Sequence, residues 1–262
     1  MGAPWKMTVK RLTSLIFGFA CMTAGLAVQT NASEIDVRGA RGVVELFTSQ
    51  GCSSCPPADA LLTKLSSDPT LVTLSFSVDY WNSLGWKDTF SRAEFTQRQR
   101  AYALVRGDRD VYTPQVVVNG RAHMVGSDAE KIAGSLAATS VEGRLPVPVS
   151  VDVSGDSVVA HIGKAQSISE AKATVWLVKY DKRDNVTIGR GENSGKTVTY
   201  ANVVTEMQPV GVWKGEAMKV ELPKTVIMAS ANTGFALLLQ VDLDGKPGPI
   251  LGATVLSNAG AT

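Results

Sequence analysis

Residues 43–56 read VVELFTSQGCSSCP. The β-branched, apolar run at its start predicts a buried strand, and the polar residues after it predict a short turn. Cys52 and Cys55 follow, at the start of a segment that predicts a helix over 53–65. A helix N-terminus carries partial positive charge and unpaired backbone N–H groups, both of which stabilise a thiolate. The pattern therefore places a nucleophilic thiol where the backbone favours its reactive form, with a second thiol one turn away.

The first 32 residues differ in kind from the rest of the chain. Three basic residues precede an apolar run over 12–28, and small residues follow at 30–32. This order predicts a secretory signal peptide over 1–32. A retained membrane anchor is the alternative, which the short, glycine-containing run disfavours. We therefore expect a periplasmic or secreted protein with no integral membrane segment after signal removal.

Cysteine usage agrees with export. Cys21 lies within the apolar run of the signal, and we expect it to be removed with that segment. Lipidation of Cys21 is the alternative, and the residues before it match the usual lead-in poorly. Cys52 and Cys55 then remain, and an oxidising exported compartment allows them to form a disulfide.

The composition suits a soluble chain with one or two packed domains, since 44% of its 262 residues are hydrophobic and 19% are charged. Residues 1–32 hold three basic residues and no acidic ones, so 23 basic and 24 acidic residues remain. This near-neutral balance gives no electrostatic basis for binding nucleic acid.

Strands and helices are expected to alternate between residues 37 and 138, because short apolar runs alternate with longer amphipathic segments. The pair Asn119-Gly120 is typical of a two-residue hairpin. Ser127, with Glu130 three residues later, forms a capping box for the last helix. The expected strands are 42–47, 71–78, 115–118 and 121–125, and the expected helices are 53–65, 92–106 and a third that ends at 138.

The pattern changes after Thr139. Valines recur at every second position from 147 to 153, and further strand candidates follow with turn residues between them. Regularly spaced strands of this kind predict an all-β, sandwich-like domain over 143–262, after an α/β domain over 33–142. The β domain has no catalytic motif, and we expect it to recruit or orient a partner. The candidates are 158–162, 174–180, 186–189, 197–207, 217–222, 234–241 and 250–256.

A second motif, Thr113-Pro114, precedes the predicted strand at 115–118. Proline cannot donate to a strand ladder, and a cis bond in a tight turn is one solution. With the strand–CxxC–helix order upstream and the ββα order downstream, residues 43–138 resemble the thioredoxin superfamily. The Thr-Pro-x-Val…Asn-Gly stretch is similar to that of glutaredoxins in particular. The resemblance implies an α/β thioredoxin-like fold, β-α-β then a helical insertion then β-β-α.

The same resemblance implies roles for four residues. Cys52 would attack a disulfide, and the buried Cys55 would resolve the mixed disulfide. Thr113 and a cis Pro114 would face the pair, and the backbone of Thr113 would accept an extended substrate by strand addition. We therefore expect a thiol–disulfide oxidoreductase that acts on protein or small-molecule disulfides and is recycled by a redox partner, without a cofactor.

Three features depart from the superfamily pattern. More chain separates the two motifs than in small glutaredoxins, including the aromatic segment 79–86. The Ser-Ser pair between the cysteines matches neither thioredoxins nor strong periplasmic oxidases, so the direction of exchange is left open. The buried acid of thioredoxins has a spacing that falls on Leu46 here, and Glu45, one residue away, is expected to face the other side of the sheet.

Over the whole chain, the sequence is similar to a family of exported bacterial proteins known as a domain of unknown function. The similarity rests on FTSQGCSSCPPAD at 47–59, on VDYW at 78–81 and on the β-rich tail. It implies export and the thioredoxin-like part, and it brings no substrate.

Two other classes of function stay open. Cys52 and Cys55 supply two soft ligands, and His123 with Met124 could complete a copper site in a copper-binding chaperone. The exported copper proteins of this fold have a cysteine spacing one residue longer. The third class is a non-catalytic binding module with an inert disulfide.

The aromatic and basic residues between the two motifs have simpler interpretations. Trp81 and Trp86 either form a hydrophobic lip for substrate or seal the insertion onto the core. The arginines of the 92–106 helix are expected to form a solvated face.

Overall fold

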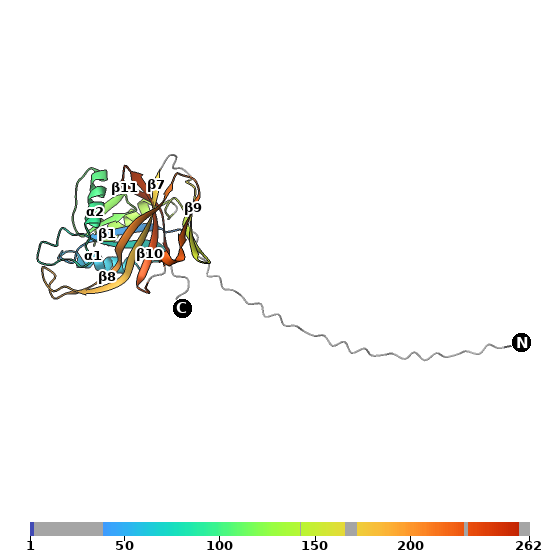
Figure 1. Ribbon diagram of the computed structural model, residues 1–262, viewed down its shortest axis with the longest axis horizontal. Helices are drawn as coiled ribbons and strands as arrows, with labels where there is room; N and C mark the ends of the chain where they lie inside the picture. Colours follow the sequence, from blue (N-terminus) through green and yellow to red (C-terminus); the bar gives the residue numbers. More distant parts are fainter. Residues whose placement is uncertain (3–38, 142, 166–171, 228–229, 257–262) are drawn as a thin grey trace. The chain divides into compact units, whose positions relative to one another are not determined.

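The computed structural model describes residues 1–2, 39–141, 143–165, 172–227 and 230–256 (Figure 1). The predicted signal peptide at 1–32, with Cys21, therefore lies outside the described residues except for its first two. By their contacts, residues 34–262 form one compact unit and residues 1–33 another. In that part of the chain, no helix is long and apolar enough to cross a membrane.

Helices and strands appear in the expected order in the first half of the unit. The strands are β1 (Gly42–Thr48), β2 (Leu71–Ser77), β3 (Gln115–Val118) and β4 (Ala122–Val125), and the helices are α1 (Pro56–Leu65), α2 (Ala93–Arg106) and α3 (Ala129–Ala138). The second half contains β5 (Val149–Ser154), β6 (Ser157–Ile162), β7 (Ala173–Thr187), β8 (Thr197–Trp213), β9 (Met218–Pro223), α4 (Lys224–Ile227), β10 (Thr233–Leu243) and β11 (Lys246–Leu256).

One large sheet contains strands from both halves, in the order β11-β10-β7-β8-β2-β1-β3-β4. β1 and β2 are parallel and joined through α1, whereas β1–β3 and β3–β4 are antiparallel. The halves meet where β2 pairs with β8 in parallel, through Ser75 and Val203. The strands on both sides of residue 143 thus belong to the same sheet, and the fold is mixed α/β with a large central sheet and few helices.

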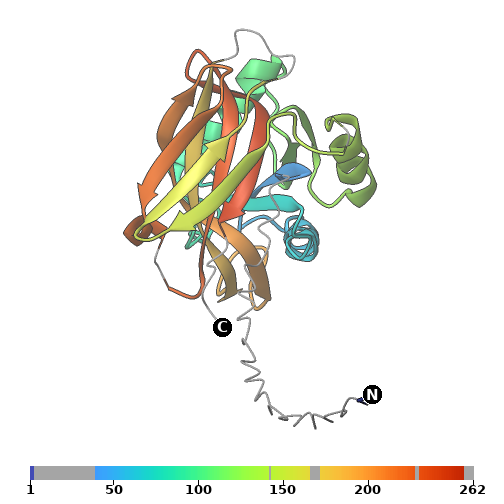
Figure 2. The same ribbon diagram turned by 90° about the vertical axis from the view of Figure 1, so that its right-hand side faces the viewer.

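The second half adds a three-stranded sheet, β5-β6-β9. Figure 2 shows β5 and β6, in yellow, lying across the orange and red strands of the large sheet. Val147, Val149 and Val151 are buried in the core between the two sheets, as their period of two predicted. A sandwich-like layering is therefore present, and one of its two sheets continues into the α/β half.

Helices cover both faces of β1, which explains why all seven of its residues are buried. Val44 and Leu46 pack against α1 and α3, whereas Val43 and Phe47 belong to the core under α2. The α2 core also includes residues of β7, β8, β10 and β11. One hydrophobic core on the α2 side therefore joins the two halves of the chain.

Glu45 faces α2, as expected, and this changes the interpretation of the α2 arginines. Arg98 donates from Nη2 to Glu45 Oε1 (2.7 Å), and its side chain is only 10% exposed. Tyr102 also donates to the Glu45 carboxylate (2.5 Å). The prediction of a solvated arginine face is wrong for Arg98, because a fully buried carboxylate on β1 requires a charged partner.

Two local predictions can be compared with the backbone. Asn119 and Gly120 both have positive φ values, 50° and 63°, as expected for a turn at this pair. Val118 pairs with Ala122, however, so the loop between β3 and β4 has three residues and not the two predicted. The capping residue of α3 is Asp128, whose carboxylate accepts from the Lys131 N–H (3.1 Å), and not Ser127 as predicted. An Asp side chain at this position satisfies one of the free N–H groups of the helix.

Candidate functional site

The two cysteines lie in the turn between β1 and α1. Cys52 and Cys55 form a disulfide, with their Cα atoms 5.4 Å apart. Backbone hydrogen bonds hold this turn: the Cys52 N–H donates to Ser49 O (3.1 Å), and the Cys55 N–H donates to Cys52 O (3.2 Å). Neither cysteine has solvent-exposed surface. The predicted pair is thus present, buried and covalently joined.

The helix after the pair begins at Pro56, three residues later than predicted. Cys55 is its N-cap residue, and Pro56 and Pro57 occupy the first helical positions. Proline is suited to these positions because their N–H groups have no partner within the helix. Cys52 therefore lies in the turn before α1, and Cys55 is the cysteine at the helix N-terminus.

The structure brings the Thr-Pro motif beside this turn. The Thr113–Pro114 peptide bond is cis. Ser54 Oγ lies 3.3 Å from Cys52 Sγ and 3.5 Å from Thr113 O, so it connects the two motifs. Pro114 also contacts Gly126, whose N–H donates to Pro114 O (2.9 Å). The four predicted site residues thus lie in neighbouring segments at one end of β1 and β3.

The two tryptophans of the aromatic segment contact the same region. Trp81 Nε1 donates to Thr113 Oγ1 (2.8 Å), so Trp81 borders the Thr-Pro motif. Trp86 Nε1 donates to Gln50 Oε1 (2.8 Å) and packs with buried residues of β8, including Tyr200. Trp81 is partly buried and packs against the core on the α2 side, and Trp86 seals the segment onto the hairpin of β7 and β8.

Residues 188–196, which connect β7 and β8, also reach the cysteine turn, although the sequence indicated only a turn there. Asn193 is 1% exposed, and its Nδ2 donates to Cys52 O (2.8 Å) and Gln50 O (3.0 Å). Glu192 Oε2 accepts from the Ser53 N–H (3.3 Å). The local pattern at 191–195 predicts a turn and carries no signal for what the turn contacts.

A second residue that the sequence analysis did not single out is Asp59, on α1. Its side chain is buried, and Thr48 Oγ1 donates to Oδ1 (2.8 Å), whereas Oδ2 has no hydrogen-bond partner among the described residues. Burial raises the pKa of the Asp59 carboxyl to about 8, the Thr48 hydrogen bond lowers it, and the charge of Asp88 raises it further. Asp59 therefore keeps its proton at neutral pH.

Asp59 lies one helical turn after Cys55, the second cysteine of the disulfide. Its N–H donates to Cys55 O (3.1 Å), the hydrogen bond of residues four apart in a helix. Side chains at this spacing lie on the same helix face, with Cβ atoms about 6 Å apart. The signal that could have found it is an acid four residues after the second cysteine, in a helix whose neighbouring positions are apolar.

His123 does not join the cysteine pair. Its Nδ1 lies 3.1 Å from both Tyr112 Oη and Gln115 Nε2, and its Nε2 lies 3.3 Å from Asp108 Oδ2. Burial and the charge of Arg106 lower the pKa of its imidazole. Among the described residues, no three His, Cys, Asp or Glu side chains are grouped as a metal site would require. The alternative set of Cys52, Cys55 and His123 is thus not assembled.

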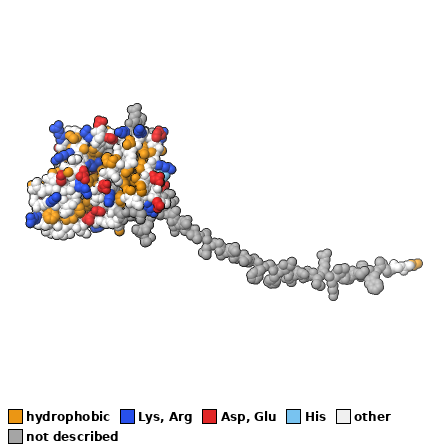
Figure 3. All heavy atoms as spheres, viewed as in Figure 1, with side chains coloured by type: hydrophobic (Ala, Val, Ile, Leu, Met, Phe, Trp, Pro, Cys, Tyr) orange, Lys and Arg blue, Asp and Glu red, His pale blue; other side chains and the backbone are white. Residues whose placement is uncertain are grey.

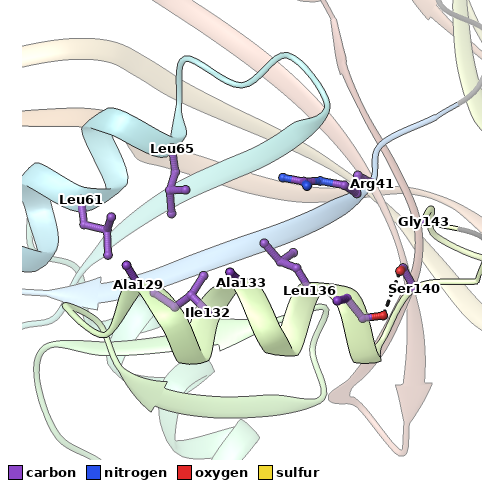
Figure 4. A pocket seen from close by; sticks show the side chains of 10 residues that line it. Arg41, Leu61, Leu65, Ala129, Ile132, Ala133, Leu136, Ser140 and Gly143 are labelled. Atoms are coloured by element: carbon purple, nitrogen blue, oxygen red, sulfur yellow. Dashed lines mark hydrogen bonds between the residues drawn. The ribbon is translucent and has the colours of Figure 1, made fainter.

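Two hollows in the surface of the described residues lie away from the cysteine turn. Figure 4 shows one of about 370 Å³ between the C-terminal half of α1 and α3, lined by Leu61, Leu65 and Ile132, with Arg41 at its end. Another, of about 650 Å³, lies between α2 and the large sheet. On the face seen in Figure 3, basic and acidic side chains of the described residues are interspersed, in agreement with the near-neutral charge.

Fold and site together define a mixed α/β protein with a large central sheet and a buried CxxC disulfide at the end of a central strand. The chain belongs to the family described as "Protein of unknown function (DUF1223)", whose model matches residues 43–240. The expected membership in a family of unknown function is therefore confirmed.

Two solved structures are similar to this chain. The X-ray crystal structure of protein AGR_C_4864 from Agrobacterium tumefaciens is 40% identical, covering 86% of this chain and 97% of that one, with a TM-score of 0.75. HBP35 of Porphyromonas gingivalis is 14% identical, covering 85% of this chain and 76% of that one, with a TM-score of 0.57, which is a likeness of fold alone. A search of the curated proteins found no match.

Proposed function

We propose that this protein is a thiol–disulfide oxidoreductase whose redox centre is Cys52–Cys55. The observation that carries the proposal is the position of the pair at the end of β1 and the start of α1, beside the Thr113–Pro114 segment. The order β1-α1-β2-α2-β3-β4-α3, with β2-β1-β3-β4 adjacent in the sheet, supports the thioredoxin-like interpretation of this half.

The proposed reaction transfers two electrons between the pair and a substrate disulfide. In the reducing direction, the Cys52 thiolate attacks one sulfur of the substrate, and the other sulfur leaves as a thiolate that takes a proton. Cys55 then loses its proton and attacks Cys52, which forms the Cys52–Cys55 disulfide and releases the second substrate thiolate. The pair loses two electrons and two protons, and the substrate gains both. A dithiol of the recycling partner then reduces the Cys52–Cys55 disulfide and becomes a disulfide itself.

Asp59 is suited to exchange the proton of Cys55 in this sequence. A carboxyl group with a pKa of about 8 has an affinity for protons close to that of a thiol. The unpartnered Oδ2 leaves one oxygen available. The role of Thr113 is to offer its backbone to an extended substrate beside the pair.

The proposal includes export. The basic, apolar and small residues of 1–32 support a signal peptide, and a pair that forms a disulfide suits an oxidising compartment. The substrate would be a protein or a small disulfide, and a separate redox partner would recycle the pair.

The test is the reduction potential of the pair. The purified protein is equilibrated across ratios of oxidised to reduced glutathione or dithiothreitol and alkylated, and its free thiols are counted by mass. We expect a potential between about −120 and −270 mV, the range of known exchange catalysts. A pair that stays oxidised well below about −300 mV would be structural and would refute the proposal.

A trapping variant tests the roles of the two cysteines. Cys55→Ser removes the resolving thiol, so a mixed disulfide between Cys52 and a substrate is expected to accumulate. Cys52→Ser is the matched control, because it keeps one thiol in the same turn but removes the attacking group. Equal yields of mixed disulfide from the two variants would contradict the assignment of Cys52 as the nucleophile.

A further inference from the structure

The tip of the β7–β8 hairpin, residues 188–196, has a fixed shape of its own. The Gly195 N–H donates to Ile188 O (2.8 Å), and the Lys196 N–H donates to Asn193 O (3.1 Å). Gly191 and Gly195 adopt the positive φ values, 77° and 80°, that this reversal of the chain uses. β8 runs beside α1, so the tip reaches the turn before that helix (Figure 1).

Asn193 fastens this tip to the cysteine turn. Both hydrogens of its Nδ2 are used, one on Gln50 O and one on Cys52 O, and its Oδ1 accepts from Lys196 Nζ (2.8 Å). An amide is the side chain that can donate twice and accept at this position, whereas a carboxylate cannot donate. The buried side chain is therefore fully hydrogen-bonded, and its bonds hold the backbone on either side of the first cysteine.

The closed arrangement conflicts with the proposed exchange. A thiolate or disulfide partner must reach a sulfur atom, and its rate depends on access. Cys52 and Cys55 have no exposed surface, although Ser53 and Ser54 between them are exposed. Glu192 adds a carboxylate 3.3 Å from the Ser53 N–H, and a nearby negative charge disfavours a thiolate. The contacts of Asn193 and of Glu192 with the cysteine turn both come from the hairpin tip.

We propose that the tip 188–196 is a latch that keeps the cysteine pair closed, and that Asn193 is the positioning residue that fastens it. The inference rests on the proposed function, because a latch regulates exchange at the same pair. Opening requires loss of the two Asn193 hydrogen bonds to the turn, and it also withdraws Glu192. Exchange with a substrate then follows opening, and the closed form protects the pair between reactions.

The test measures how fast the disulfide is reduced by dithiothreitol, with samples alkylated at increasing times. Dithiothreitol closes into its cyclic disulfide and gives two electrons and two protons to the pair, so the assay needs no natural substrate. Removing two hydrogen bonds from the closed form is expected to make reduction of Asn193→Ala about tenfold faster. Asn193→Asp is expected to be reduced faster than wild type but more slowly than Asn193→Ala, because it loses both donors and adds a negative charge beside the turn.

Asn185→Ala is the matched control, since Asn185 lies in the same hairpin and accepts a hydrogen bond from Thr199 Oγ1 away from the tip. We expect it to be reduced at the wild-type rate within about twofold. A folded Asn193→Ala that is reduced no faster than this control would overturn the latch. A merely structural role would lower the melting temperature of the variant and leave the reduction rate of the folded protein unchanged.

A gentler variant keeps the proposal testable if Asn193→Ala does not fold. Lys196→Met removes the partner of Asn193 Oδ1 from an exposed position and is expected to speed reduction about threefold. If it has the wild-type rate, the latch is again contradicted. The rate comparison tests the latch separately from the redox function. If the reduction potential of the pair is too low for exchange, the proposed function is refuted, but the reduction rates of the variants can still be compared with that of wild type.

Discussion

The buried Asp59 carboxyl group, one helical turn after Cys55, is expected to make the stability of the protein depend on pH. Its pKa in the folded protein is about 8, against an ordinary value of 3.8, so the folded state keeps a proton that the unfolded state loses. The stability that this proton provides is present below pH 4 and is lost as the pH rises through about 8. Asp59→Asn keeps the acceptor for Thr48 without an ionisable group. Its stability relative to wild type should therefore rise by up to about 1.4 kcal/mol per pH unit across this window.

The measurement is urea unfolding of wild type and Asp59→Asn at several pH values. The matched control is Asp128→Asn, because Asp128 is partly exposed to solvent and its pKa is lowered, not raised, by its hydrogen bonds with Lys131. Curves for wild type and Asp59→Asn that run parallel between pH 4 and 8 would mean that Asp59 is ionised in the folded protein. The proton-exchange role given to Asp59 would then be lost as well.

At the scale of elements, a substitution in the β3–β4 hairpin can test how tightly the two halves of the chain pack against each other. Gly120, in its turn, has a positive φ, and a Cβ atom there would lie 2.4 Å from Gly248 O of β11. The Ile250 N–H donates to Asn119 O (2.9 Å) at the same contact. Gly120→Ala should therefore suffer both the cost of a left-handed conformation, about 1–2 kcal/mol, and that of overpacking, about 1–3 kcal/mol.

Gly107→Ala is the control for this substitution. Gly107 ends α2 with a φ of 78°, and a Cβ atom there would have no neighbour within 4 Å. It should lose only the conformational part, about 1–2 kcal/mol, when both variants are unfolded in urea. Equal losses in the two variants would show that β11 yields at the Gly120 contact.

The elements that could be predicted from the sequence are those whose signal is local. The β1–turn–α1 segment and the Asn119-Gly120 hairpin depend on residues a few positions apart, and the structure has both. The start of α1 was displaced because Pro56 and Pro57 fit the first helical positions better than the middle of a first turn. Arg98 was misjudged because its partner, Glu45, lies on another element.

At the scale of the whole molecule, the features of the site that the sequence does not predict arise from contacts between distant segments. Asn193 reaches Cys52 only because β7 and β8 extend the sheet that contains β1, and no pattern around residue 193 encodes that pairing. Asp59 stands within a motif that the sequence analysis quoted, but its helix, α1, packs beside β8, which lies far away in the sequence. One part of the candidate site, the cysteine turn, is therefore encoded by neighbouring residues, whereas the contacts of Asn193 depend on the complete sheet.

The shared sheet predicts how the chain responds to truncation after residue 142. Such a fragment lacks β8, the neighbour of β2, and the hydrophobic residues of β7, β10 and β11 that complete the core under α2. It would expose an unpaired strand edge and a large apolar face. We expect it to bind a hydrophobic dye and to unfold without a cooperative transition, as followed by circular dichroism in urea.

Removal of residues 1–32 alone is the control, because these residues lie outside the compact unit. That shorter chain should unfold cooperatively, with its disulfide formed. A fragment ending at 142 that also unfolded cooperatively, with the same disulfide, would mean that the α/β part folds as an independent domain. In that case the strands of the second half would be an addition to a complete fold, and the tip of the β7–β8 hairpin would be the part of that addition that acts on the redox pair.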